Sequence, residues 1–199
     1  MSILRKIGNR LRRLQMTVLR DSTFRSRSDL PGCSLQPTVL VDALIETIKP
    51  RTALDVGCGT GKALDYFLAK GVDCFGVEGS TMAVGHAVHP ERITVWNLNK
   101  PYQAGRLFDL VWCFEVAEHI HPSYASSFLD TLCSHAPHIL LSAAHPGQGG
   151  VGHFNEQPPS YWIRKLAERG FNYDDALTKR ITMNWQWYPD NVMFFRRPV

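Results

Sequence analysis

The chain has 199 residues, of which 44% are hydrophobic, and its formal net charge is +4. This length suits a single domain with a sizeable core, and no apolar run approaches the roughly 20 residues that cross a bilayer, which argues against a transmembrane segment. The five cysteines are odd in number and include no CxxC pair, which argues against a disulfide framework and favours reduced thiols in the cytoplasm.

The positive charge is concentrated at the start of the chain. Residues 1–27 contain eight Lys and Arg and one acid, whereas the other residues contain 14 basic and 17 acidic side chains, a net charge of −3. Apolar residues recur at helical spacing within residues 3–19, which predicts a basic amphipathic helix. Its role stays open between packing on the body, binding an anionic partner such as a membrane or nucleic acid, and serving as an organelle presequence.

We divide the chain into this basic arm, residues 1–35, and a single domain, residues 36–199. Within the domain, short apolar strands alternate with helices, which predicts an α/β fold with a doubly wound, mostly parallel sheet. The aromatic segment 171–199 is expected to add a strand pair that is not a βα repeat. Strands are predicted at 52–56, 74–77, 93–96, 108–114, 138–142 and 192–195, and helices at 38–48, 62–70, 80–88, 123–134 and 159–169.

The segment LDVGCGTG, residues 54–61, joins the first predicted strand to the following helix. Glycine adopts positive φ and lets a ligand approach the backbone, and the start of the helix offers unpaired N–H groups. A turn of this kind is suited to holding a polar cofactor at the carboxyl end of a sheet. The pattern GxxxxGK[ST] of a phosphate loop is absent, and the spacing GxGxG differs from the dinucleotide pattern GxGxxG.

With Asp55 before it, the GxGxG spacing resembles motif I of the class I S-adenosylmethionine (SAM)-dependent methyltransferases. Further motifs follow in order, namely Glu78 at the end of the second strand and FDLVWCFEVAEHIHP around the fourth, so the resemblance covers about residues 36–196. It implies a Rossmann-like, seven-stranded methyltransferase fold and SAM as the cofactor. The implied cofactor-binding residues are Asp55, Gly57, Cys58, Gly59, Gly61, Glu78, Gly79, Asn97, Leu98 and Phe114.

Two of these residues carry specific expectations from the resemblance. Glu78 stands where the family has the acid that accepts hydrogen bonds from both ribose hydroxyls, although an acid at this point can also cap a helix. Asn97 stands where the family usually has an Asp that holds the adenine amino group. Its amide oxygen can accept the same hydrogen bond without the charge.

The segment EVAEHIHP follows the fourth strand. If it begins a helical turn, Glu115, Glu118 and His119 share one face. His119 is then a candidate general base, with Glu115 and His153 as further catalytic candidates. Alternatively, the segment with a later His resembles the metal site of small-RNA 3′-terminal 2′-O-methyltransferases and of some quinone-precursor O-methyltransferases. That resemblance implies Glu115, Glu118, His119 and His153 as ligands of a divalent metal, but other family members with EVxEH hold no metal, and both readings stay open.

Two segments are candidates for the acceptor site. Residues 144–157 form a long loop with four glycines, which we interpret as a mobile flap over the site or, alternatively, a surface connection. The aromatic side chains of Trp185, Trp187 and Tyr188 either line the acceptor site or belong to the core.

Together these observations predict a cytoplasmic SAM-dependent methyltransferase that methylates a hydroxyl of a small molecule or glycan. One alternative is a metal-assisted RNA 2′-O-methyltransferase, for which the basic arm would bind RNA. Another is a SAM-binding subunit without activity that docks a catalytic partner through residues 1–27. The acceptor and the oligomeric state cannot be read from the sequence.

Overall fold

The strands form one mixed sheet. The computed structural model describes residues 37–198, so the arm and the amphipathic helix expected at residues 3–19 lie outside the described residues. Within the described part, seven strands pair in the order β3-β2-β1-β4-β5-β7-β6. β1 to β5 are parallel, and β7 is antiparallel to both β5 and β6, which confirms the doubly wound, mostly parallel sheet and its terminal strand pair. The strands are β1 (Thr52–Val56), β2 (Asp73–Glu78), β3 (Ile93–Val95), β4 (Leu110–Phe114), β5 (His138–Ser142), β6 (Asn172–Tyr173) and β7 (Val192–Arg196).

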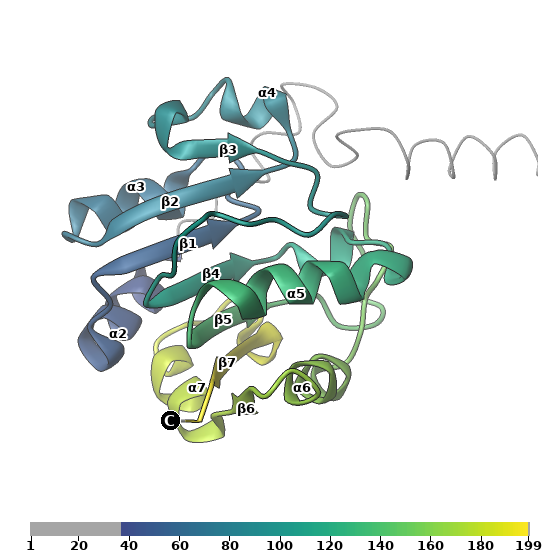
Figure 1. Cartoon of the computed structure of the whole chain (residues 1–199). Coiled ribbons are helices and arrows are strands. Elements are labelled where there is room, and N and C mark those ends of the chain that lie inside the picture. The colour runs from purple at the N-terminus through teal and green to yellow at the C-terminus, as the bar shows by residue number, and fades with distance from the viewer. Residues whose placement is uncertain (1–36, 199) are drawn as a thin grey trace, which may run out of the picture.

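Helices cover both faces of this sheet (Figure 1). The α-helices are α2 (Thr38–Ile48), α3 (Lys62–Ala69), α4 (Thr81–Val84), α5 (Ala125–His135), α6 (Pro159–Ala167) and α7 (Asp175–Thr182). Short 3₁₀ turns are η2 (Pro90–Arg92), η3 (Ala117–His119), η4 (Pro122–Tyr124) and η5 (Pro189–Asn191). No helix between residues 37 and 198 combines the length and the apolar character needed to cross a membrane.

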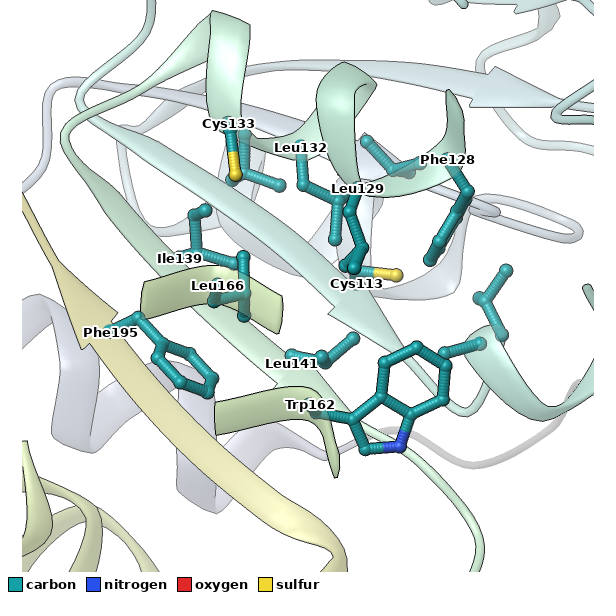
Figure 2. Packing of buried hydrophobic residues seen from close by; sticks show 14 of the residues in the cluster. Cys113, Phe128, Leu129, Leu132, Cys133, Ile139, Leu141, Trp162, Leu166 and Phe195 are labelled. Atoms are coloured by element: carbon teal, nitrogen blue, oxygen red, sulfur yellow. The ribbon is translucent and has the colours of Figure 1, made fainter. Parts of the chain in front are cut away.

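The two faces of β4 pack into separate cores, because successive side chains of a strand point to opposite sides of the sheet. Val111 and Cys113 belong to the cluster that contains the buried side chains of α5 and α6, such as Phe128 and Trp162 (Figure 2). Leu110 belongs to the opposite cluster, with the buried side chains of α2, α3 and α7. A strand covered on both faces has no polar position, which explains the continuous apolar run that marked it in the sequence.

The amino ends of β1 and β4 are held together by Asp109. Its Oδ2 accepts hydrogen bonds from the backbone N–H of Arg51 at 2.8 Å and of Thr52 at 3.0 Å. The Asp109 N–H in turn donates to Thr52 Oγ1 at 2.9 Å. These bonds hold Asp109 against the residues at the start of β1, before the pairing of β1 with β4 begins. β4 therefore begins at Leu110 and not at the predicted residue 108.

Two helices differ from the prediction by more than two residues at either end. α4 ends at Val84, although a helix to residue 88 was predicted. The N–H groups of His86 and Ala87 donate to carbonyls three residues earlier, and not four as in an α-helix. α7 was not predicted, yet its start is a standard cap in which the Asp174 side chain accepts from the Leu177 N–H at 3.0 Å. The sequence analysis missed this helix because it interpreted the aromatic segment 171–199 as a strand pair.

The substitution Leu141→Ala is expected to lower the free energy of unfolding by roughly 2–5 kcal/mol, because Leu141 is fully buried in β5 between α5 and α6 and the truncation leaves a cavity. Urea unfolding followed by far-ultraviolet circular dichroism measures this loss. The matched control Leu107→Ala removes the same atoms from a side chain that is 75% exposed, and is expected to stay within about 0.5 kcal/mol of the wild type. Equal losses in the two variants would contradict this assignment of the core.

Candidate functional site

The sequence-predicted site residues gather at one edge of the sheet. β1 to β5 are parallel, so their carboxyl ends meet at the edge toward which their arrowheads point in Figure 1. The order of the strands along the chain reverses between β1, which pairs with β2, and β4, which pairs with β5. Ligands of α/β proteins bind in the crevice beyond such a reversal.

The glycine turn after β1 is shaped by contacts with both neighbouring strands. Gly57 adopts φ +78°, and a β-carbon there would lie 2.7 Å from Cγ1 of Val116 and closer still to Cγ2, so only glycine fits. Its N–H donates to the Val77 carbonyl at 2.8 Å. The turn is therefore packed against the segment that follows β4 while it is bonded to β2.

Glu78 links the glycine turn to the start of α4. Its Oε2 accepts from the Gly59 N–H and its Oε1 from the Ser80 N–H, each at 2.8 Å, and the side chain is 7% exposed. Close by, Trp96 donates its N–H to the Glu78 carbonyl, and the next residue, Asn97, uses its side-chain oxygen to accept from the Asn99 N–H at 3.0 Å.

Asp55 adds a second buried acid beside Glu78. Burial, and after it the charge of Glu78, raise the pKa of Asp55 to about 8, although a hydrogen bond from the Leu64 backbone acts in the opposite direction. The Oδ2 atom of Asp55 is buried and has no hydrogen-bond partner among the described residues. Asp55 therefore holds a proton near neutral pH when no ligand is bound, and a cation bound beside it would favour its ionised form.

The remaining residues implied for the cofactor surround this pair of acids. Cys58 and Gly61 lie in the turn, where the Gly61 N–H donates to the Cys58 carbonyl at 2.8 Å. Gly79 directly follows Glu78 beside the backbone of the segment after β3, and Leu98 is buried in that segment. Phe114, at the end of β4, stacks on Trp112 with ring centroids 5.5 Å apart. All ten implied residues thus lie on or next to the carboxyl ends of β1 to β4.

The expectation that Glu115, Glu118 and His119 share a helical face is wrong. Glu115 adopts left-handed backbone angles with φ +55°, and the 3₁₀ turn η3 begins only at Ala117. The Glu115 carboxylate accepts from the Ser142 hydroxyl and, at 3.2 Å, from Asn191 Nδ2. Glu115 is therefore held by β5 and η5, and it does not share a helical face with Glu118 and His119.

Glu118, His119 and His153 come together, with one ligand atom from each within 4.8 Å of the others. Glu118 is fully buried, and neither of its carboxylate oxygens has a hydrogen-bond partner among residues 37–198. Burial, and then the charge of Glu115, raise the pKa of Glu118 well above its usual range. We call Glu115, Glu118, His119 and His153 the acid–histidine cluster.

The two imidazole rings of this cluster are oriented by different acceptors. His119 Nδ1 lies 3.1 Å from the Gly152 carbonyl, and since a carbonyl only accepts, Nδ1 carries the proton and Nε2 keeps its lone pair. Burial, and then the charge of His153, lower the pKa of His119 to about 4. His153 Nδ1 lies 2.8 Å from Oε1 of Glu156, and the two rings meet edge to face with centroids 4.9 Å apart.

The loop 144–157 lies against this cluster and is folded by its own hydrogen bonds. The Glu118 carbonyl accepts from the N–H groups of Phe154 at 2.8 Å and Asn155 at 3.0 Å. Glu156 accepts from the N–H groups of Gly147 at 2.8 Å and Gly149 at 2.7 Å in addition to His153. These bonds, that from His153 most of all, lower the pKa of Glu156, so its carboxylate is ionised at neutral pH.

Four residues that touch or organise the cluster were not among the sequence candidates. Glu156 orients His153, Ser142 and Asn191 hold Glu115, and Gln148 Oε1 accepts from Asn191 Nδ2 at 3.1 Å. Asn191 is only 2% exposed, and Ser142 is a buried polar residue that follows the apolar residues 139–141 of β5. A buried polar residue beside an apolar strand is the kind of signal that could have drawn attention to both.

One of the three aromatic tail residues packs against the core, and the other two are exposed. Trp185 packs against the core with its ring edge on Phe114, at 5.9 Å between centroids. Trp187 and Tyr188 contact each other and are 50% and 49% exposed. The imidazole of His145 also lies 3.0 Å from the Asp190 carbonyl, so the tail and the loop 144–157 are neighbours.

Comparisons with known proteins place this geometry in context. The family model described as a methyltransferase domain matches residues 37–176. A ubiquinone biosynthesis O-methyltransferase of Nitrosomonas europaea is 30% identical over 152 residues, which are 65% of this chain and only 58% of that protein.

Solved structures share the fold at low sequence identity. The sugar N-methyltransferase from Streptoalloteichus superposes with a TM-score of 0.68 at 15% identity, over 91% of this chain and 96% of that one. The SAM-bound amino pentose methyltransferase of calicheamicin biosynthesis from Micromonospora echinaspora gives 0.67 at 14% identity, over 90% and 100%.

The buried acid Asp55 predicts a pH dependence of stability in the absence of ligand. Its pKa is about 8 when folded and 3.8 as the unperturbed value, so between these pH values the folded chain binds the extra proton and the free energy of unfolding falls as pH rises. Asp55→Asn removes this term. Urea unfolding of both proteins at about pH 5 and pH 8 is expected to show the variant gaining on the order of 3 kcal/mol relative to the wild type at the higher pH. A difference between the two proteins that does not change with pH would contradict the assignment.

Proposed function

Since the chain belongs to the methyltransferase-domain family, among the class I SAM-dependent methyltransferases, we propose that it transfers a methyl group to a hydroxyl of a small molecule or glycan. The observation that carries the proposal is the acid–histidine cluster beside the glycine turn, where two imidazole Nε2 atoms have lone pairs for a hydroxyl proton. A relative whose name states O-methylation supports this class of acceptor, whereas the two structural neighbours support the fold alone.

The residues of the glycine turn fit the proposed cofactor. When bound, SAM supplies a methyl group on a positively charged sulfur, a good leaving group. Oδ2 of Asp55 has no hydrogen-bond partner among the described residues, and a cationic ligand would favour the ionised form of this acid. From the family resemblance we assign to Glu78 the ribose hydroxyls and to Asn97 the adenine edge.

The acceptor side follows from the position of the acid–histidine cluster. The contact between Gly57 and Val116 brings the segment after β4 against the glycine turn. An acceptor bound at His119 and His153 therefore lies next to the turn, where it can be aligned with the methyl group, and alignment is a major source of rate enhancement. We propose that the loop 144–157, together with the exposed Trp187 and Tyr188, borders the acceptor side of the site.

The cofactor assignment is tested by calorimetry. Wild-type protein is expected to bind SAM, and Glu78→Ala is expected to weaken binding at least about tenfold, because it removes an acceptor for the ribose and releases Gly59. Asp109→Ala is the matched control, since it also deletes an acid that accepts backbone N–H bonds, but at the opposite edge of the sheet. Absence of SAM binding by the wild type, or equal weakening in both variants, would refute the assignment.

The acceptor class is tested by release of S-adenosylhomocysteine with a panel that includes 3,4-dihydroxybenzoate and methyl glucoside. Turnover with a hydroxyl compound and none with its O-methylated form supports the proposal. Turnover only with amines would replace O-methylation by N-methylation.

A second proposal is that Glu118, His119 and His153 hold a divalent metal. The observation in its favour is the cluster itself, in which an unpartnered buried carboxylate meets two imidazole rings whose Nδ1 atoms are already engaged. Two His and one Glu suit zinc or a similar transition metal, and a bound metal lowers the pKa of a coordinated hydroxyl. Glu115 is committed to Ser142 and Asn191, so we assign it a supporting role.

Titration of chelator-treated protein with Zn²⁺ tests this second proposal. Binding of one equivalent is expected, and His153→Asn is expected to weaken it at least about tenfold. His138→Asn is the control, because His138 bonds the Asp109 carbonyl at the amino end of β5, away from the cluster. Identical titrations of the two variants, or turnover unaffected by chelator, would exclude a metal from the reaction.

A further inference from the structure

The segment between β3 and β4, residues 96–109, contains no helix or strand, although it carries Asn97, to which we assign the adenine edge of the cofactor. A connection of this length without regular structure is uncommon in a compact domain and often functional. Its first residue is fixed, because the Trp96 N–H donates to the Glu78 carbonyl at 2.8 Å. In Figure 1 the segment then returns to the start of β4 on the side of the sheet that α5 covers.

Two side chains of α5, one helical turn apart, hold the far part of this segment. Oγ1 of Thr131 accepts from the Tyr102 N–H at 3.0 Å, and Nε2 of His135 accepts from the Ala104 N–H at 2.9 Å. Nδ1 of His135 lies 2.7 Å from the Thr131 carbonyl, and since a carbonyl only accepts, Nδ1 carries the proton and leaves Nε2 as the acceptor. Thr131 and His135 are each 1% exposed, so water has little access to replace either bond.

Ring contacts connect these bonds back to Asn97. The imidazole of His135 stacks on Tyr102, with centroids 5.6 Å apart and an angle of 22° between the rings. The Tyr102 ring packs against Trp96, the residue before Asn97, with centroids 5.9 Å apart. The Trp96 indole donates to the Lys100 carbonyl at 3.3 Å, and the Lys100 N–H donates to the Asn97 carbonyl at 2.9 Å, which closes a turn around Asn97. Asn97 is therefore positioned from β2 at one end of the segment and from α5 at the other.

We propose that Thr131 and His135 are positioning residues for the cofactor, which hold the segment after β3 so that Asn97 selects adenine over hypoxanthine. This inference rests on the proposed SAM binding and deepens it. The side-chain oxygen of Asn97, which accepts from the Asn99 N–H, has a second lone pair for the amino group of adenine. Hypoxanthine has an oxygen in place of that amino group and offers no donor there. Recognition of this kind requires the binding group to be held within about 0.5 Å, so release of the segment is expected to remove the preference.

Calorimetry with S-adenosylhomocysteine and S-inosylhomocysteine, whose base is hypoxanthine, tests the inference. The wild type is expected to bind the adenosine compound at least about tenfold more tightly. Thr131→Val keeps the size of the side chain but removes the acceptor for Tyr102, and His135→Asn has no acceptor at the position of Nε2. Both variants are expected to bind S-adenosylhomocysteine more weakly and to prefer it by less than about threefold, because Asn97 is no longer held in place.

Three further variants are matched controls. Thr131→Ser and His135→Gln each keep an acceptor at the original position, so they are expected to retain the preference for adenine. Thr178→Val removes the acceptor that Thr178 of α7 offers to the Phe194 N–H at 2.9 Å, which is a bond of the same kind toward the opposite end of the sheet from β3. It is also expected to retain the preference, whatever its effect on stability.

The outcomes separate positioning from stability and from the proposed function. Weakening of both ligands by the same factor in Thr131→Val and His135→Asn would overturn the inference, because the two residues would then act on stability alone. A wild type that binds the two compounds equally, or a Thr178→Val variant that also loses the preference, would overturn it as well.

If the wild type binds neither compound, the proposed function fails and the base preference fails with it. Amide hydrogen exchange without ligand still decides whether α5 holds the segment. The Tyr102 amide in Thr131→Val and the Ala104 amide in His135→Asn are expected to exchange at least about tenfold faster than in Thr178→Val, and unchanged exchange would overturn the holding role.

Discussion

The close approach of the glycine turn to the segment after β4 is the constraint on which the rest of the site depends. A β-carbon at Gly57 would overlap the γ-methyl groups of Val116, so this contact exists only because residue 57 has no side chain. It lies where β1 and β4 pair and the chain order reverses. The buried acids in the last residues of β1 and β2 and the acid–histidine cluster after β4 consequently lie at the same edge of the sheet, as transfer of a group between two bound molecules requires.

Two buried acids at this edge of the sheet have carboxylate oxygens without a hydrogen-bond partner among residues 37–198, namely Oδ2 of Asp55 and both oxygens of Glu118. Burial of such groups opposes folding and raises their pKa values, so it favours their protonated forms when no ligand is bound. A bound cation would favour their ionised forms instead. The cofactor that we propose beside Asp55 and the metal that we propose beside Glu118 are both cations.

The loop 144–157 is rich in glycine, and its hydrogen bonds define its conformation. Its glycines indicated a mobile flap, but Glu156 gathers two backbone N–H groups and His153, and the Glu118 carbonyl accepts from Phe154 and Asn155. The glycines let the backbone turn toward these acceptors, and the acceptors select one arrangement. The same bonds that fold the loop also orient the imidazole of His153, so the order of the loop and the chemistry of the site are linked.

The sequence by itself determined what depends on local pattern. β1 and β5 have the predicted bounds, and the spacing of the glycines with Asp55 and Glu78 identified the family and its fold, because strand alternation and turn chemistry act over a few residues. The family resemblance also named the four residues of the acid–histidine cluster, but only the tertiary structure decided how they are arranged and held. Glu115 takes a left-handed conformation and meets Asn191, which is 76 residues away, while His153 and Glu156 reach the site through loop hydrogen bonds. Such contacts depend on which strand ends the folded sheet brings together, and no local periodicity in the chain records that.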